Sequence, residues 1–344
     1  MSKVTHQAAI GTRKGKPFIV QQRPTPTPGP CQVLVTPKAL ALNPVDYIMR
    51  DGFNVASFPV VLGSDAAGII TQVGPGVSNL KVGDRVLTFC QAFSQKGAPD
   101  FGAFQETVLV PVEFITPIPK SLSYIDAAAL PLAIYTTATG YFVQLKVPRE
   151  GYKPADKKAM LVWGAGGSIG TVAVQVAKIL GFTVYATASA KHHDYLKSLG
   201  AHACFDYKDA DVVSQVVKAI EGDGFALESG YLATGDLKQI VKAVGHFKSP
   251  HAKVAAAPFS FNMLWWRLYD WGGVAVEFVV PPPPADIDEF FKFVYTEWLK
   301  NLLDQKLIIA SPKIELVDGG LGGIQTALGK LKSGVSGVKV VVEL

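Results

Sequence analysis

The sequence is short of cysteine, and the cysteines that it has are isolated. Three occur among 344 residues and none belongs to a CxxC pair, namely Cys31, Cys90 and Cys204. A disulfide-stapled scaffold needs more cysteines, and a structural zinc site needs them in close pairs. Neither class of protein is indicated, and the length is enough to bury one large core or two ordinary ones.

The sequence also lacks a long uninterrupted apolar segment. Residues 1–16 hold no apolar stretch long enough for a signal peptide. The most hydrophobic region, residues 254–280, is broken by Arg267, Asp270 and Glu277 and is too short between charges to span a bilayer. We therefore expect a soluble protein of the cytoplasm that makes no use of a membrane.

Charge of one sign is not concentrated anywhere along the chain. There are 33 basic and 28 acidic residues, a formal net charge of +5, and the excess is spread out. This balance favours anionic ligands slightly but is not typical of a nucleic-acid-binding protein. The composition, 49% hydrophobic and 18% charged, is that of a globular protein.

The first third of the chain reads as β-rich. Up to about Pro119, short β-prone runs such as QVLVTPKALAL and AAGIITQVG alternate with glycine, proline and asparagine turns. This pattern predicts a compact barrel-like or sandwich domain. The following segment turns helical, with Ser123 as the expected N-cap and apolar residues at helical spacing.

From Ala159 onwards the pattern changes to strands that alternate with helices. The strand AMLVWG is followed by the helix SIGTVAVQVAKILG and then by the strand FTVYATA, and the alternation continues downstream. Such alternation predicts an α/β fold with a parallel, doubly wound sheet covered by helices on both faces. The C-terminal segment adds a helix and a final strand, which could return to the first domain.

A glycine-rich turn joins the first strand and helix of this region. Glycines at such a turn let the backbone approach a pyrophosphate, and the N–H groups at the helix start favour its negative charge. The alternative is a plain tight turn, but the strand–turn–helix–strand context favours a dinucleotide site. Its predicted residues are Ala165, Gly166, Gly167, Ser168, Ile169 and Gly170.

The end of the second strand indicates which dinucleotide is bound. Sites for NAD commonly place a carboxylate there, about 20 residues beyond the turn, on the ribose 2′-hydroxyl. Here that place holds Ser189, followed by Lys191, so a hydroxyl and a cation are available for a 2′-phosphate. Tyr207, after the next strand, adds a third contact. The sequence predicts NADPH, against the alternative of an ordinary solvated loop.

Motifs along nearly the whole chain resemble the medium-chain dehydrogenase/reductase superfamily. In the family's order come ALNPVDYIMRDG, VLGSDAAGIITQVGPGVSNLKVGDRV, LPLAIYTTATGYF, VWGAGGSIG and GGLGGIQTALGKLKSGVSGVKVVV. The chain is most similar to the zinc-independent quinone reductase and enoyl reductase branch, which includes fungal trans-acting enoyl reductases. The resemblance implies a discontinuous GroES-like catalytic domain over residues 1–127 and 296–344, around a Rossmann NADPH-binding domain over residues 128–295.

The resemblance also implies roles for individual residues. Thr136 matches a threonine beside the nicotinamide ribose, and the stretch with Asn43, Asp46 and Tyr47 matches the active-site floor. We expect Tyr47, Asn43 and Thr136 to take part in catalysis, with Tyr135 as a further hydroxyl at the substrate. For Tyr47 the alternative is a core aromatic with a satisfied hydroxyl, and for Asn43 it is a role in the Asn-Pro turn.

Zinc ligands of the family are absent from the sequence. Zinc-dependent relatives place a cysteine near position 43 and Gly-His-Glu where this chain has Gly63, Ser64 and Asp65. A catalytic zinc needs three ligands of the His, Cys or Glu type, and none of the three cysteines stands at a matching place. We therefore expect no bound metal.

Aromatic residues are clustered between residues 265 and 278, after the predicted strand–helix pairs. In the family this region lines the acyl pocket, so we expect a large apolar or aromatic substrate to contact it. The alternatives are core packing or a subunit interface. The residues expected in the pocket are Tyr135, Trp265, Trp266, Tyr269 and Phe278.

These expectations define one leading function and three alternatives. The leading hypothesis is an NADPH-dependent reductase of an activated C=C bond in an enoyl thioester or an enone. The substrate is either free or tethered to the carrier of a polyketide synthase. Without a metal, alcohol oxidation loses its usual driver, whereas enone reduction needs mainly position and enolate stabilisation. The alternatives are an NADPH:quinone oxidoreductase, a zinc-independent alcohol or ketone dehydrogenase, and a non-catalytic dinucleotide-binding protein.

Overall fold

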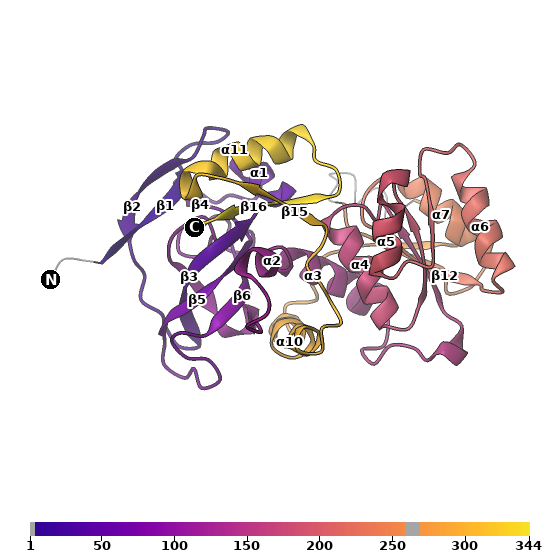
Figure 1. Cartoon of the computed structure of the whole chain (residues 1–344), viewed down its shortest axis with the longest axis horizontal. Coiled ribbons are helices and arrows are strands. Elements are labelled where there is room, and N and C mark those ends of the chain that lie inside the picture. Colours follow the sequence, from indigo (N-terminus) through magenta and orange to yellow (C-terminus); the bar gives the residue numbers. More distant parts are fainter. Residues whose placement is uncertain (1–3, 259–268) are drawn as a thin grey trace. The chain divides into compact units, whose positions relative to one another are not determined.

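The computed structural model describes residues 4–258 and 269–344 (Figure 1). The chain separates into two compact units. The first consists of residues 1–132 and 288–344, and the second of residues 133–287. No helix in the described ranges is long and apolar enough to cross a membrane.

The first unit is built on two β-sheets. Three strands form the smaller sheet in the order β2 (Ile19–Pro24), β1 (Thr5–Gly11), β4 (Val60–Val61). The larger sheet has the order β15 (Lys313–Val317), β16 (Val338–Glu343), β3 (Gln32–Ala41), β5 (Asp65–Val73), β6 (Arg85–Phe89), β8 (Ile115–Pro117), and β7 (Val108–Pro111) also pairs with β3. Figure 1 shows the yellow C-terminal strand β16 alongside the N-terminal strand β3.

Short helices complete this unit. Ser123 caps α2 (Tyr124–Ala128) as predicted, because its Oγ accepts a hydrogen bond of 3.0 Å from Asp126 N. The long C-terminal helix α11 (Gly320–Ser333) packs near α1 (Pro44–Arg50). The remaining helices are η1 (Val112–Phe114), α9 (Ile287–Phe291), η5 (Lys292–Trp298) and α10 (Leu299–Asp304).

The second unit is a six-stranded sheet in which every described strand pair is parallel. Its order is β11 (Ala203–Phe205), β10 (Thr183–Thr187), β9 (Ala159–Trp163), β12 (Leu227–Leu232), β13 (Lys253–Ala256), β14 (Ala275–Phe278). Numbered from β9, this is 3-2-1-4-5-6, the order of the doubly wound dinucleotide-binding fold. The predicted α/β class is therefore confirmed.

Helices follow the strands of this sheet, as the alternating pattern predicted. Buried apolar residues of β9, β12 and β13 pack in one core with those of two helices, α6 (Val212–Gly222) and α7 (Leu237–His246). The helices among the described residues of the unit are α3 (Pro131–Ala138, which begins in the first unit), η2 (Thr139–Gln144), η3 (Pro154–Asp156), α4 (Ser168–Ile179), η4 (Ala190–His192), α5 (His193–Leu199), α6 (Val212–Gly222) and α7 (Leu237–His246).

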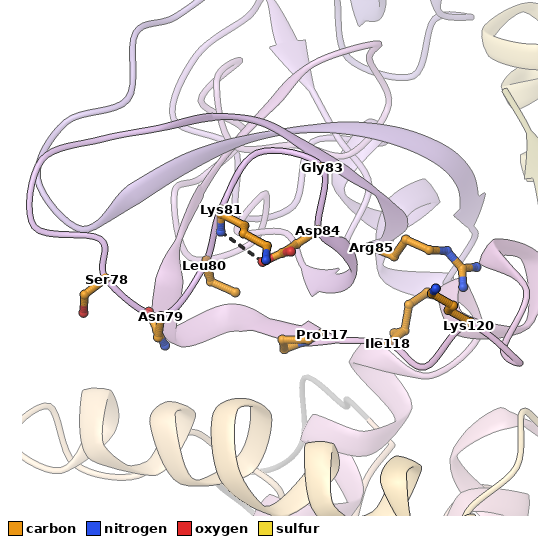
Figure 2. Close-up of a pocket in the computed structure, with 10 residues that line it drawn as sticks. All are labelled: Ser78, Asn79, Leu80, Lys81, Gly83, Asp84, Arg85, Pro117, Ile118 and Lys120. Carbon is orange, nitrogen blue, oxygen red and sulfur yellow. Dashed lines mark hydrogen bonds between the residues drawn. The ribbon is translucent and has the colours of Figure 1, made fainter.

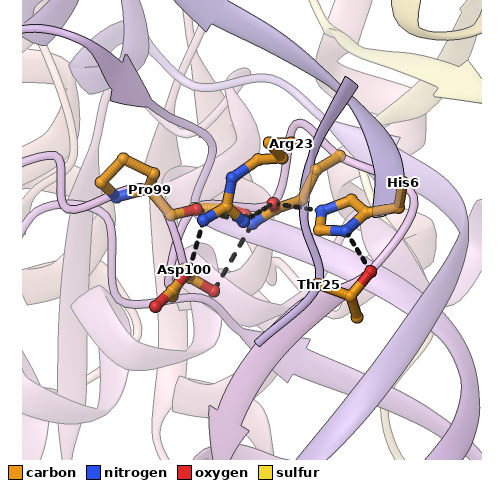
Figure 3. Close-up of polar contacts among 7 residues, drawn as sticks. His6, Arg23, Thr25, Pro99 and Asp100 are labelled. Carbon is orange, nitrogen blue, oxygen red and sulfur yellow. Dashed lines mark hydrogen bonds and ion pairs between the residues drawn. The ribbon is translucent and has the colours of Figure 1, made fainter. Parts of the chain in front are cut away.

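A buried polar network fixes the β1–β2 hairpin of the first unit (Figure 3). Gln105, which is fully buried, donates from Nε2 to the carbonyl oxygens of Pro99 (2.9 Å) and Gly102 (2.7 Å). Its Oε1 is therefore an acceptor, and it lies 2.9 Å from His6 Nε2 and 2.8 Å from Arg23 Nη1. His6 thus carries its hydrogen on Nε2, and burial lowers its pKa.

We predict that Gln105→Leu lowers the free energy of unfolding by about 3 kcal/mol, because His6 Nε2, Arg23 Nη1 and the carbonyls of Pro99 and Gly102, all buried or partly buried, lose their hydrogen bonds to Gln105. Urea denaturation of both proteins measures the difference. Gln21→Leu, at an exposed position of the same hairpin, is the control. A loss below about 1 kcal/mol for Gln105→Leu, the usual size for an ordinary single hydrogen bond, would contradict the role of the network.

Candidate functional site

The glycine turn after β9 has the close contacts that a pyrophosphate-binding turn requires. Gly164, at φ +74°, donates to Thr187 Oγ1 at 3.0 Å, and Ala165 N donates to Thr187 O at 2.8 Å. The turn is thereby fixed to the end of β10. A Cβ atom added at Gly170 would lie 2.5 Å from Ala165 Cα, so only glycine lets α4 pack this close to the turn.

Space is left open at the start of α4. Gly167 is the N-cap of this helix, and a Cβ atom added there would meet nothing within 4 Å. The first backbone N–H groups of α4 follow directly, at Ser168, Ile169 and Gly170. Unpaired N–H groups at a helix start attract anions. The turn also follows β9, where the strand order reverses between β10 and β12, the place at which ligands bind in doubly wound sheets.

The structure brings the residues predicted to hold the 2′-phosphate close together. Ser189 follows β10 and Tyr207 follows β11, and these strands pair in parallel through Thr187 and Phe205. Ser189 Oγ therefore lies 3.4 Å from Tyr207 Oη. Lys191, two residues beyond Ser189, is exposed and forms no ion pair within the described part of the chain.

A carboxylate that the sequence argument missed lies next to these residues. Asp206 Oδ1 accepts from Lys208 N (3.0 Å), and its Oδ2 accepts from Ala190 N (3.1 Å). The hydrogen bond from Lys208, followed by that from Ala190, lowers the pKa of Asp206. The acid expected after the second strand of an NAD site is thus absent there, but another stands after the third strand. The parallel register of β10 and β11 is the signal that would have revealed it.

Tyr135 and Thr136 lie on α3, and their backbone carbonyls accept hydrogen bonds from side chains of the second unit. Thr136 O accepts a hydrogen bond of 3.0 Å from Tyr231 Oη, and Tyr135 O accepts one of 2.8 Å from Thr139 Oγ1. Burial raises the pKa of Tyr135 to about 12, so its hydroxyl stays protonated at neutral pH. A protonated hydroxyl is a hydrogen-bond donor, as the predicted role of Tyr135 requires.

Asn43 belongs to a buried polar cluster at the start of α1 in the first unit. Its Nδ2 donates to Asp65 Oδ2 at 2.8 Å, and its Oδ1 accepts from Lys339 Nζ at 2.6 Å. Lys339 also donates to Asp65 Oδ2 at 2.9 Å, and Leu132 N donates to Asp65 Oδ1 at 2.7 Å. Lys339 and Asp65 are 2% and 0% exposed in their side chains, so this is an ion pair away from water.

Asp46 adds a second carboxylate to the cluster. Its Oδ2 accepts from Asn43 N at 2.7 Å, which closes the capping box of α1. Its Oδ1 is buried and has no hydrogen-bond partner among the described residues. Burial raises the pKa of Asp46 to about 7; Asp65 acts in the same direction, whereas the Asn43 N–H and Lys339 oppose it.

Tyr47 is half-buried on α1, one residue beyond Asp46. The ammonium of Lys332 lies 5.8 Å from the centre of its ring, within the range of a cation–π contact. No hydrogen bond of its hydroxyl occurs within the part of the chain that the structure describes. The geometry therefore leaves the Tyr47 hydroxyl available as a donor to a ligand.

Apart from Tyr135, the aromatic residues predicted to line a substrate pocket separate into three groups. Trp265 and Trp266 lie outside the described residues. Tyr269 is 62% exposed and its ring lies 4.8 Å from that of Trp271. Phe278, in β14, is buried in the core of the parallel sheet. Phe278 therefore makes the contacts expected if the aromatic cluster packs in the core, which was one of the alternatives to a substrate pocket.

A cavity of about 630 Å³ opens elsewhere in the first unit (Figure 2). It is lined by the loop before β6 and by residues at the end of β8, with the cations Lys81, Arg85 and Lys120. Arg85 is fixed by hydrogen bonds to Pro119 O (3.1 Å) and Leu122 O (2.7 Å). None of the residues predicted for the reaction lines this cavity.

The described residues contain no group of three His, Cys, Asp or Glu side chains that could hold a metal ion. Asn43 and Asp65 lie where the resemblance places a cysteine and the end of a Gly-His-Glu stretch in zinc-dependent relatives, and here both bind the ammonium of Lys339. A divalent cation does not fit beside a buried ammonium. Cys90 is buried, and burial followed by the charge of Asp65 raises its pKa.

Comparison with known proteins places two family models on the chain. Residues 29–120 match the model described as "Alcohol dehydrogenase GroES-like domain", and residues 168–245 match "Zinc-binding dehydrogenase". An alcohol dehydrogenase superfamily protein from Novosphingobium aromaticivorans has the same fold, with a TM-score of 0.77 at 22% identity, over 98% of this chain and 99% of that one.

Two curated fungal proteins are much more similar in sequence. The trans-enoyl reductase tndF of Aspergillus flavipes is 43% identical over 98% of this chain and 99% of its own length. The trans-enoyl reductase tazE of Aspergillus terreus is 46% identical over 74% of this chain and 86% of its own. The similarity to tndF therefore covers both units of the chain.

We predict that Asp46 makes the stability of the protein fall as the pH rises from about 4 through 7. The carboxyl is protonated in the folded protein below its raised pKa of about 7, whereas in the unfolded chain it ionises near pH 4. Its contribution is complete below pH 4 and is lost by about pH 8, for a total of roughly 4 kcal/mol at most.

Asp46→Asn mimics the neutral acid and keeps an acceptor for Asn43 N, so we expect it to remove this part of the slope. Urea midpoints at pH 5, 6, 7 and 8 compare the variant with the unmodified protein. Asp318→Asn, at an exposed position of the same unit, is the matched control. Parallel curves for Asp46→Asn and the unmodified protein would show that Asp46 is not the titrating group.

Proposed function

The chain belongs to the medium-chain dehydrogenase/reductase superfamily, and we propose that it is an NADPH-dependent trans-acting enoyl reductase of fungal secondary metabolism. The observation that carries this proposal is the 43% identity to the trans-enoyl reductase tndF over 98% of the chain. The similarity to tazE supports it independently. The glycine turn and the buried cluster at Asn43 supply residues for the two tasks of such an enzyme, cofactor binding and stabilisation of charge on the substrate.

The residues at the turn after β9 fit a dinucleotide. The open space at Gly167 and the close approach at Gly170 make room for a pyrophosphate at the start of α4. Ser189, Lys191 and Tyr207 would hold the 2′-phosphate of NADPH, and the positive charge of Lys191 opposes the nearby carboxylate of Asp206. When bound, NADPH supplies a hydride to the β-carbon of the unsaturated substrate.

The chain's own residues then have to stabilise negative charge on the substrate's carbonyl oxygen. Neutral donors are suited to this task, because charge develops on that oxygen as the β-carbon is reduced. We assign the role to Tyr47, with its available hydroxyl, and to the Asn43 amide, while Thr136 holds the nicotinamide ribose. Since Lys339 occupies the place beside Asn43 and Asp65, the proposal involves no zinc.

The proposed substrate is an unsaturated thioester on the carrier of a polyketide synthase. The names of tndF and tazE, both described as a trans-enoyl reductase, support an enoyl substrate, and the carrier of a polyketide synthase is our proposal for what holds it. A separate reductase of this kind must meet a substrate that another protein holds. We place this reaction in the cytoplasm.

We predict that the protein oxidises NADPH with an α,β-unsaturated pantetheine thioester and yields the saturated thioester. Absorbance at 340 nm and mass spectrometry of the product measure the reaction, with NADH and a simple 1,4-quinone in parallel. Consumption with the quinone alone would assign the protein to the quinone reductases instead. NADPH that binds but is never oxidised by either substrate would contradict the enoyl reductase and favour a binding protein.

Lys191→Ala tests whether Lys191 makes the protein prefer NADPH to NADH. We expect it to weaken NADPH binding about 10-fold or more, because one charge-assisted contact to the 2′-phosphate is lost, and to leave NADH binding unchanged. Lys208→Ala, next to Asp206 on the following loop, is the control. Equal effects of Lys191→Ala on NADPH and NADH would show that Lys191 does not read the 2′-phosphate.

A further inference from the structure

The buried lysine of the C-terminal strand has a fixed place opposite Asn43. β16 and β3 pair antiparallel, with Val341 opposite Ala41, and the register continues as Leu42 N donates to Val340 O at 3.0 Å. Continued by one more step, this register brings Lys339 opposite Asn43. The only charged residue in the run VKVVV thus reaches the residue that we expect at the substrate.

The cluster allows the Asn43 carboxamide one orientation. An ammonium can only donate and an ionised carboxylate can only accept. Oδ1 must therefore face Lys339 at 2.6 Å, and Nδ2 must face Asp65 at 2.8 Å. If the amide were flipped, Nδ2 would face the ammonium of Lys339, another donor, and Oδ1 would face the carboxylate of Asp65, another acceptor. Asp65 is itself held by the Leu132 N–H, so the acceptor side cannot turn away.

The same arrangement strengthens the amide as a donor. A cation at Oδ1 draws electron density from the carboxamide, and this makes its N–H bonds more acidic. One Nδ2 hydrogen is used on Asp65, and the other has no partner among the described residues. That second N–H is left as a donor, and it is both oriented and polarised by the lysine.

We propose that Lys339 is a positioning residue, which holds the Asn43 amide so that its second N–H stabilises the enolate oxygen of the substrate. This inference rests on the proposed enoyl reductase function and deepens it. Lys339 does not touch the substrate. It acts through Asn43, and Asp65 balances its charge so that the ammonium can remain buried.

A purely structural role for Lys339 has different consequences. Buried ion pairs can often be replaced by apolar residues with little loss of stability. If Lys339 served only the fold, its loss would change stability and cofactor binding together with turnover. If it acts through Asn43, turnover falls while binding is preserved, and the effect vanishes when Asn43 is already absent.

The test compares Lys339→Met, Asn43→Ala and the double variant with the unmodified protein, in the enoyl thioester assay with NADPH. We expect kcat to fall about 10-fold for Lys339→Met and about 100-fold for Asn43→Ala. The double variant should match Asn43→Ala within about twofold. KM and the Kd for NADPH should change less than twofold throughout. Lys313→Met, an exposed lysine on the neighbouring strand β15, is the control.

If Lys339→Met does not fold, a second pair of variants tests the same inference. Lys339→Arg keeps the cation and should retain most of the turnover, whereas Lys339→Met with Asp65→Asn removes both charges and should lose it. A folded variant without the cation that keeps the kcat of the unmodified protein would overturn the inference. So would a further 10-fold loss on the Asn43→Ala background. No turnover by the unmodified protein would instead overturn the proposed function.

Discussion

The ion pair between Lys339 and Asp65 is the interaction on which the buried polar cluster of the first unit depends. It joins the last strand of the chain to the first residue of β5, and through Asn43 it reaches the start of α1. Two charges removed from water are stable only with close geometry and further hydrogen bonds, and here the ammonium and the carboxylate oxygens are all engaged. Asp46 lies beside this pair, and its burial, followed by the charge of Asp65, raises its pKa and favours its neutral form.

The second unit depends on a constraint of a different kind, the close approach of backbone to backbone. Gly170 lets α4 start against Ala165, and Gly164 bends the chain at the end of β9. The result is an open helix start at the point where the sheet reverses its strand order. Glycine and parallel topology thus leave the start of α4 open to an anion without any charged side chain, and we propose that the charge that distinguishes a 2′-phosphate from a hydroxyl is that of Lys191.

Local patterns in the sequence were enough for the fold. Strand–helix alternation from Ala159 predicted the parallel sheet, and residues 165–170 lie between β9 and α4, where the predicted dinucleotide turn was expected. The partners of Asn43 could not be predicted in the same way, because Lys339 lies almost 300 positions away and only the register of β16 brings it close. Asp206 stands directly before Tyr207 and was missed because the rule for a ribose-binding carboxylate points to the end of the second strand, not of the third. Phe278 belongs to the core of the sheet, and residue type alone does not distinguish a core aromatic from one that lines a pocket.

The position at which hydride enters the product tests the central claim most directly. NADPH that carries deuterium at the transferred position of C4 is incubated with the unsaturated thioester, and the product is analysed by mass spectrometry and NMR. An enoyl reductase places one deuterium on the β-carbon and one solvent proton on the α-carbon, and leaves the carbonyl intact. Deuterium on the carbonyl carbon, with the double bond retained, would show that the protein reduces carbonyl groups and would contradict the account.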